Sequence, residues 1–136
     1  MVKASKESEA GNLPSPALLA EMGKFNQALV SAGVMLAGEG LHASAKGARV
    51  SFAGGRPTVI EGPFPEADQL VAGFWIWQVK SRQEAIDWLK RAPFQDATVE
   101  IRQLFEAADF APADPTGELR QNEAGLRATI ESRGRH

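Results

Sequence analysis

A single internal histidine, followed about twenty residues later by a carboxylate in a Gly-Pro turn, is the part of this sequence best suited to chemistry. His42 ends the apolar, glycine-containing run of residues 34–41, and Glu61 opens the sequence Glu61-Gly62-Pro63-Phe64. An imidazole changes its charge near neutral pH, and a neighbouring carboxylate can orient it. The pair therefore predicts proton transfer, with His42 as the acid or base and Glu61 as its orienter or as a second base.

Other polar groups close to this pair are candidates for contacting a substrate. Glu39 precedes His42 by three positions and Ser44 follows it by two. Strand alternation puts Glu39 and His42 on the same face only if Gly40 forms a bulge. Each group also has a structural interpretation: His42 as a strand-end residue bonded to backbone, Glu39 as a solvated edge carboxylate, and Glu61 as an acceptor of turn hydrogen bonds. The residue types alone leave both interpretations open.

Three aromatic residues are candidates for the walls of such a ligand site. Phe64 lies in the Gly-Pro turn, and Trp75 and Trp77 are two positions apart, so they share one face of a strand. Bulky aromatic side chains on a sheet face are also typical of contacts between subunits. For Trp75 and Trp77 we prefer this second interpretation.

Composition limits the classes of partner and cofactor. The net charge is −2 with both signs interspersed, which offers no basic face for nucleic acid and no polybasic anchor for a membrane. The chain has no cysteine, so disulfides, thiol nucleophiles and cysteine-ligated metals are excluded. With one useful histidine and scattered carboxylates, we expect neither a metal nor another cofactor. The polar start of the chain lacks the apolar core of a signal peptide, so we expect a cytoplasmic protein.

The first half of the chain predicts one helix, one buried strand and a hairpin. Ser15 as N-cap, Pro16 at the first helical position and Gly33 as the stop delimit an amphipathic helix. A strand is expected over residues 34–41, and a hairpin over 49–61 with Gly54-Gly55 in its turn. Residues 1–4 form a strand too short to be useful, and a polar loop follows it.

The second half predicts a strand, a helix, a strand and a last helix. The strand over residues 74–79 is apolar on both faces, so both faces should be covered. The capping box of residues 81–84 starts a helix that Pro93 ends, and residues 98–105 alternate as a strand. A third helix over residues 115–132 carries a thin apolar stripe, which suits docking on a surface or on a partner subunit.

This order of elements predicts an α+β fold of the ferredoxin-like type. Two β-α-β units with a hairpin inserted between them give one sheet with both helices on the same face. The other face would then be bare. Because the strand over residues 74–79 is apolar on both faces, we expect a second copy of the chain to bury that face, giving a homodimer.

The motifs together resemble the YCII-related family, and within it the DGPF branch, named for an Asp-Gly-Pro-Phe turn. The resemblance covers about residues 1–110 and depends mainly on residues 33–42, the Glu61-Gly62-Pro63-Phe64 turn and residues 72–77. It implies a ferredoxin-like fold, a homodimer whose sheets pack face to face as a dimeric α+β barrel, and a cleft whose active pair is a His and an Asp. It implies no agreed reaction.

Two positions depart from the pattern of that family. The turn carries Glu61 where the family has an aspartate, so the carboxylate is one methylene longer. The first strand, usually a full apolar run, is reduced to residues 1–4, from which we expect the native chain to begin upstream.

We therefore expect a YCII/DGPF-like domain over residues 1–110 and a helical extension over residues 111–136. Two classes of function follow from the residues and the resemblance. One is a cofactor-free acid/base enzyme of the isomerase or lyase type acting on a small polar metabolite. The other is a non-catalytic module that binds a small ligand or has an accessory or regulatory role, with the third helix as its protein contact.

Overall fold

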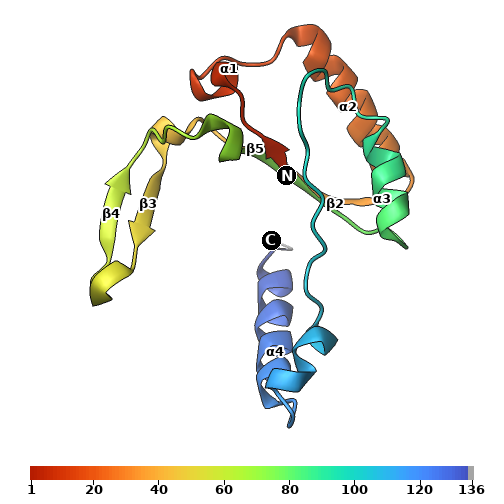
Figure 1. The fold of residues 1–136 in the computed structure, drawn as a ribbon. Coiled ribbons are helices and arrows are strands. Elements are labelled where there is room, and N and C mark those ends of the chain that lie inside the picture. Colours follow the sequence, from red (N-terminus) through yellow and green to blue (C-terminus); the bar gives the residue numbers. More distant parts are fainter. Residues whose placement is uncertain (135–136) are drawn as a thin grey trace. The chain divides into compact units, whose positions relative to one another are not determined.

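The computed structural model describes residues 1–134 as two compact units, one spanning Met1–Ile101 and the other beginning at Arg102 (Figure 1). We describe each unit by itself. Among the described residues no helix combines the length and the apolar character that crossing a membrane requires.

A three-stranded antiparallel sheet forms the centre of the first unit. The strands lie in the order β1 (Val2–Lys3), β5 (Val71–Trp77) and β2 (Met35–Gly40). Residues 98–100 pair with the free side of β1 through an antiparallel bridge between Val2 and Val99. The resulting order, with residues 98–100 beside β1 and β2 at the far edge, is that of a ferredoxin-like sheet. The predicted α+β, ferredoxin-like fold is confirmed; the single chain does not form a closed barrel.

The strand predicted for residues 98–105 is wrong in its extent. Ladder hydrogen bonds join the amide nitrogen of Lys3 to the carbonyl of Thr98 at 3.1 Å, and that of Glu100 to the carbonyl of Met1 at 2.9 Å. The ammonium group of Met1 also donates to the carbonyl of Glu100 at 2.9 Å. An edge strand extends only as far as its neighbour provides donors and acceptors, so alternation along residues 101–105 is not sufficient to continue the sheet.

The long helix α2 (Pro16–Ser31) begins and ends close to the predicted residues. The Ser15 hydroxyl accepts a hydrogen bond from the amide of Leu18 at 3.1 Å, and Pro16 occupies the first turn. Gly33 follows the helix with a φ of 73°, a left-handed conformation in which glycine has no Cβ penalty. The chain then turns directly into β2.

The second predicted helix, α3 (Arg82–Leu89), is also present but shorter than expected. The Ser81 hydroxyl accepts from the amide of Glu84 at 3.1 Å, as a capping box requires. The Glu84 carboxylate, however, accepts from the amide of Lys80 at 2.8 Å, one residue before the cap. Residues 90–92 leave the helix ahead of Pro93.

Both helices cover the sheet face that carries the two tryptophans. Phe25 of α2 meets the rings of Trp75 and Trp77 edge-on, with centroid distances of 5.8 and 6.3 Å. The indole N–H of Trp75 donates to Asn26 Oδ1 of α2 at 2.9 Å. Phe25, Leu29 and Val34 are the centre of the core, and the partly buried residues packed around it are Met22, Met35, Trp75, Trp77, Val79, Trp88 and Ala92.

Our preferred interpretation of Trp75 and Trp77 as a contact between subunits is therefore wrong, because both pack against α2 within their own chain. The predicted alternation along β5 is correct, but the face that α2 and α3 leave uncovered is the one opposite Trp75 and Trp77. Phe74 and Ile76 lie on that face, paired with Glu39 and Ala37 of β2. Leu36, at the β-bulge of β2, is 60% exposed. We call this surface the open sheet face.

A separate two-stranded sheet is formed by β3 (Ala48–Ser51) and β4 (Thr58–Glu61), the predicted hairpin (Figure 1). Gly54 and Gly55 in its loop have φ values of 70° and 79°, as tight turns require. Three short 3-10 turns, η1 (Ser44–Lys46), η2 (Ala53–Gly55) and η3 (Ala67–Gln69), complete this region. Where we expected only a polar loop, Ser5 and Ser8 form a capping box that starts the short helix α1 (Lys6–Glu9).

The second unit contains the 3-10 segment η4 (Ala107–Ala113) and the predicted last helix, α4 (Glu118–Arg133). Asp114, 5% exposed, caps α4. Its carboxylate accepts from the amides of Leu119 and Arg120 at 3.2 and 3.0 Å, and from the Arg120 side chain at 3.1 Å. The two units divide the chain at residues 101 and 102, whereas we expected domains of residues 1–110 and 111–136.

Candidate functional site

The loop that carries His42 begins where β2 leaves the sheet. The last ladder bond joins the amide of Leu41 to the carbonyl of Ala72 at 2.8 Å, and η1 follows. The His42 side chain is exposed. An imidazole at a strand end is held by a rigid element while its ring remains accessible, as a proton-transferring group requires.

Ser44 holds this loop to two other segments. Its amide donates to Glu9 Oε2 of α1 at 2.8 Å, and its hydroxyl donates to Glu9 Oε1. The same hydroxyl oxygen accepts from the amide of Phe64 at 2.9 Å. Ser44, which we predicted to contact substrate, thus joins α1, the His42 loop and the Gly-Pro turn; we call these three hydrogen bonds the Ser44 clamp.

The clamp also changes the acidity of Glu9. The hydrogen bond from the Ser44 hydroxyl holds the pKa of the Glu9 carboxyl below its ordinary value, and the bond from the Ser44 amide adds a smaller effect in the same direction. Both donors stabilise the charged form of the carboxyl. Glu9 lies in a segment for which the sequence predicts a polar loop, so it is not among the predicted site residues. The signal that could have found it is the pair of serines three residues apart at Ser5 and Ser8, which predicts a helix start.

The Gly-Pro turn lies directly against the same loop. The amide of Gly62 donates to the carbonyl of Gly47 at 3.0 Å. A Cβ added to Gly62 would overlap the carbonyl oxygen of Ser44 and come within 2.6 Å of its carbonyl carbon. Glycine at position 62 is therefore required by the close approach of two backbones.

This contact brings the segments of His42 and Glu61 together, but it does not test the predicted dyad. Glu61 pairs with Ala48 at the base of the hairpin, and its side chain is exposed like that of His42. Within residues 1–134, neither side chain has a hydrogen bond or an ion pair with a described residue. Direct interaction of the two groups stays a prediction. Glu39, also exposed, lies opposite Phe74 on the open sheet face.

The aromatic candidates are distributed over two environments. The Arg49 guanidinium lies 3.9 Å from the centroid of the Phe64 ring and also pairs with Glu66 at 3.6 Å. The Phe64 ring, at the end of the Gly-Pro turn, is thus packed against the Arg49 side chain. Trp75 and Trp77 belong to the core under α2, as described above. Arg49 was not among the predicted site residues, and its place in an alternating strand carries no signal for this contact.

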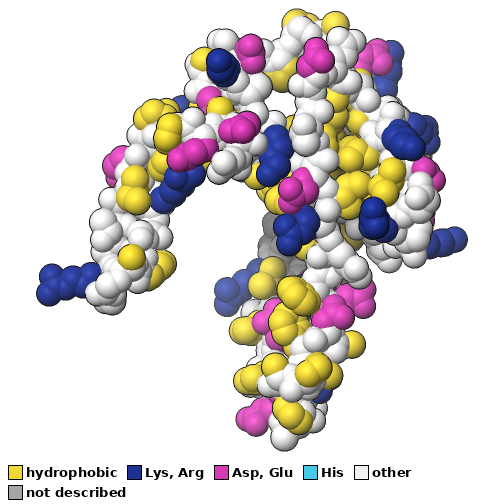
Figure 2. All heavy atoms as spheres, in the orientation of Figure 1, with side chains coloured by type: hydrophobic (Ala, Val, Ile, Leu, Met, Phe, Trp, Pro, Cys, Tyr) yellow, Lys and Arg dark blue, Asp and Glu magenta, His cyan; other side chains and the backbone are white. Residues whose placement is uncertain are grey.

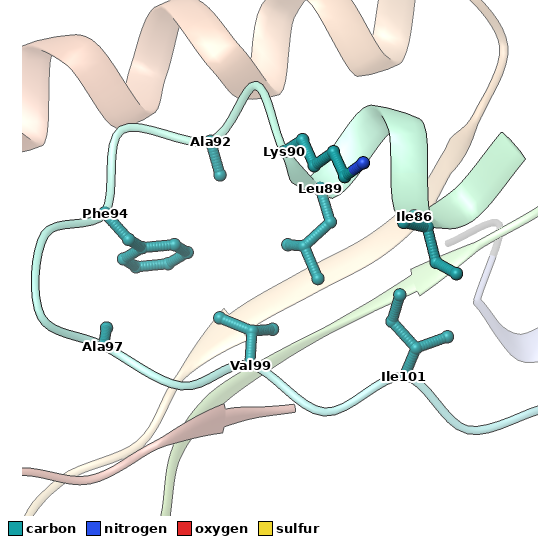
Figure 3. A pocket seen from close by; sticks show the side chains of 8 residues that line it. All are labelled: Ile86, Leu89, Lys90, Ala92, Phe94, Ala97, Val99 and Ile101. Carbon is teal, nitrogen blue, oxygen red and sulfur yellow. The ribbon is translucent and has the colours of Figure 1, made fainter. Parts of the chain in front are cut away.

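Two grooves on the first unit lie away from these residues. One, of about 430 Å³, runs between α3 and residues 92–101 and is lined by Ile86, Leu89, Lys90, Ala92, Phe94, Ala97, Val99 and Ile101 (Figure 3). The other, of about 500 Å³, lies between the start of α2 and residues 93–95. None of the predicted site residues lines either groove. In the part of the chain that the structure describes, no group of three or more His, Asp or Glu residues is placed to hold a metal ion.

Comparison with known proteins agrees with this architecture. The family model of the YCII-related domain matches residues 2–108, which is most of the chain and nearly all of the first unit. No curated protein matches.

Gly62→Ala tests the backbone contact between the turn and the His42 loop. We expect a loss of about 1–3 kcal/mol or more in the free energy of unfolding, because a methyl group at this position must displace backbone. Gly40→Ala is the matched control, since an added Cβ there has no atom within 4 Å. Urea unfolding measures both. Equal losses in the two variants would contradict the contact.

Glu9→Gln tests the Ser44 clamp through its pH dependence. The pKa of Glu9 is lower in the folded chain than when unfolded, so its stabilising effect is present above its ordinary pKa of 4.5 and is lost as the pH falls through the folded value. The melting temperature of the variant should be lower than that of the wild type near neutral pH, and the difference should shrink below about pH 4. Glu7→Gln, on the same helix, controls for charge. A pH-independent difference would contradict this role of Glu9.

Proposed function

Because the chain belongs to the YCII-related family, we propose that it is a homodimeric, cofactor-free acid/base protein acting on a small polar metabolite. The reaction would be an isomerisation or an elimination. The contact of the Gly62 backbone with the Ser44 carbonyl supports this proposal best, since it brings the turn that carries Glu61 to the loop that carries His42. Assignment to the DGPF branch and a cytoplasmic location accompany the proposal as predictions.

Each candidate group has a role in this proposal. His42 gives and takes the proton, and Glu61 orients the imidazole or acts as the second base. Carboxylate and imidazole would each favour the charged form of the other if they interact. The Ser44 clamp supports the loop, because the O–H of Ser44 donates to Glu9 and its oxygen accepts from Phe64. A substrate is held by Glu39 and the exposed backbone of the loop, at the edge of the open sheet face.

The open sheet face supports the homodimer. Leu36 and Leu41 are 60% and 50% exposed, and Phe74 and Ile76 lie beside them on the face that carries neither α2 nor α3. A sheet that is apolar on both faces is stable in water when both faces are covered. A second copy related by two-fold symmetry offers the same apolar surface in return. Because Glu39 lies on this face, dimer formation would also enclose the site.

Ile76→Glu tests the dimer. The variant should be monomeric at a concentration at which the wild type is dimeric, because an unpaired carboxylate in the contact costs several kcal/mol. Gln27→Glu adds the same charge at an exposed position on α2, on the opposite face of the sheet, and should remain dimeric. Sedimentation velocity measures both. A wild-type protein that is monomeric at micromolar concentration would exclude this assembly.

Proton exchange in deuterated water tests the chemistry without knowledge of the substrate. A panel of small 2-oxo acids and lactones is incubated with the protein, and deuterium at the carbon next to the carbonyl is followed by NMR. We expect wild-type protein to accelerate exchange in one compound, and His42→Asn to reduce the rate about 10²–10⁴-fold. Glu61→Gln should also reduce it, whereas Asp87→Asn, which removes a carboxylate on α3, should not.

The same assay separates the two classes of function. Saturable binding of a compound without exchange, in wild type and His42→Asn alike, would replace the enzyme by a small-ligand-binding module. Loss of exchange in His42→Asn with binding retained would support catalysis, because it separates the chemical step from recognition.

A further inference from the structure

The second unit carries an apolar helix face without a core to cover it. Leu119, Leu126 and Ile130 of α4 are 65%, 61% and 69% exposed, and hydrophobic side chains gather on this helix in Figure 2. From residue 102 to residue 134 the only buried residue is Asp114, the polar cap. A helix in a globular protein depends on packing of its amphipathic face for most of its stability. The face of α4 therefore requires a partner.

The three apolar residues form one stripe. They are seven and four residues apart, and at 3.6 residues per turn such positions lie above one another along the helix. Near the middle of the stripe, a Cβ added to Gly125 would meet no atom within 4 Å. Another segment can therefore approach the backbone of α4 closely beside Leu126.

The charges on α4 indicate what the partner is. Acidic and basic side chains alternate along the helix in the order Glu118, Arg120, Glu123, Arg127, Glu131 and Arg133. Read from the other end, each sign is reversed. An antiparallel second copy crossing near residues 125 and 126 would therefore oppose every acid with a base, whereas a parallel copy would oppose like with like.

Two of these pairings fall on the flanks of the stripe, between side chains that are exposed. Glu118 would face Arg133 of the second copy, and Glu123 would face Arg127 of the second copy. Within one chain Glu123 and Arg127 already pair at 3.1 Å with their side chains largely exposed, so both remain accessible. Flanking charges of this kind set partner choice and orientation in paired helices. The third pairing, of Arg120 with Glu131 of the second copy, adds no support to this contact, because Arg120 already pairs with Asp114 of its own chain.

From the stripe and the antisymmetric charges we propose that α4 pairs antiparallel with α4 of a second copy of this chain, about a two-fold axis near residues 125 and 126. The contact is isologous, since each helix offers the same residues to the other. It is independent of the open sheet face, which lies in the first unit. A dimer can use one or both contacts.

Crosslinking through a single introduced cysteine tests the position of the axis, because the chain has no cysteine of its own. In the full chain, Leu126→Cys should form a disulfide-linked dimer on mild oxidation. Ala128→Cys, on the opposite side of the helix, should link at least about tenfold more slowly. Leu119→Cys should not link to itself, because the antiparallel copies of this position are about 19 Å apart at a rise of 1.5 Å per residue.

Charge exchange tests the partner. Glu123→Arg and Arg127→Glu are each combined with Leu126→Cys, and crosslinking is measured for each protein alone and for their mixture. Each alone places like charges across the axis and should link about tenfold more slowly, whereas the mixture should form the mixed dimer at the original rate. The internal pair is broken in both proteins, so recovery in the mixture reports only the contact between copies. Glu21→Lys and Lys24→Glu, an exposed pair on α2, should show no such recovery.

The outcomes separate the alternatives. Self-linking of Leu119→Cys as fast as Leu126→Cys would mean a parallel pair and would overturn the proposal. Equal rates for Leu126→Cys and Ala128→Cys, or no recovery in the mixture, would mean that the stripe does not contact a second copy. Because crosslinking reports on α4 itself, these results do not depend on whether the open sheet face forms a dimer.

Discussion

The aromatic contact between α2 and β5 is the interaction on which the first unit depends. Phe25 meets both Trp75 and Trp77, and the Trp75 indole is tied to Asn26. Gly38 makes room for this indole, since a Cβ there would approach Trp75 within 2.8 Å. The contact holds α2 on one face of the sheet, where Trp88 of α3 packs against the same cluster. Within the first unit, the opposite face, with its own apolar residues, is left without a layer.

The same constraint places the candidate chemistry at the edge of the sheet. With α2 and α3 on one face, β2 ends at the edge of the sheet in a loop on which His42 is exposed. The loop is nonetheless held from two sides, by the Ser44 clamp and by the backbone of Gly62. Rigid support beneath an exposed group is what a proton-transfer site needs, because the reacting atoms must be held close to their productive geometry.

Exposed apolar surface is the feature that the two units share. The first unit has the open sheet face, and the second has the stripe of α4, although Asp114 caps that helix thoroughly. A chain of this length that buries few side chains fully gains little stability from its own core. Contacts with a second copy would supply the missing burial, because an isologous contact covers the same apolar surface on both copies.

Local signals in the sequence were sufficient for the long helices, the hairpin and the fold class. Ser15, Pro16 and Gly33 delimit α2 by satisfying or avoiding backbone groups within a few residues, and the glycines at 54 and 55 set the hairpin turn. Such interactions involve residues that are neighbours along the chain, so the sequence alone predicts them. The same holds for α4, whose cap and stripe lie within twenty residues of each other. The family motifs added the expected His42 and Glu61.

Tertiary structure alone decided which face of β5 is covered and what holds the site. Alternation places Trp75 and Trp77 on one face of β5 and the pair Phe74 and Ile76 on the other. Because both faces are apolar, the local sequence does not predict which face the helices cover. Likewise, the partner of Ser44 is Glu9, thirty-five residues earlier in the chain. The strand at residues 98–105 ends early because its extent depends on β1, almost a hundred residues away. These features depend on contacts between segments that are distant in the sequence. The free energy of such contacts depends on both segments, so neither segment alone predicts them.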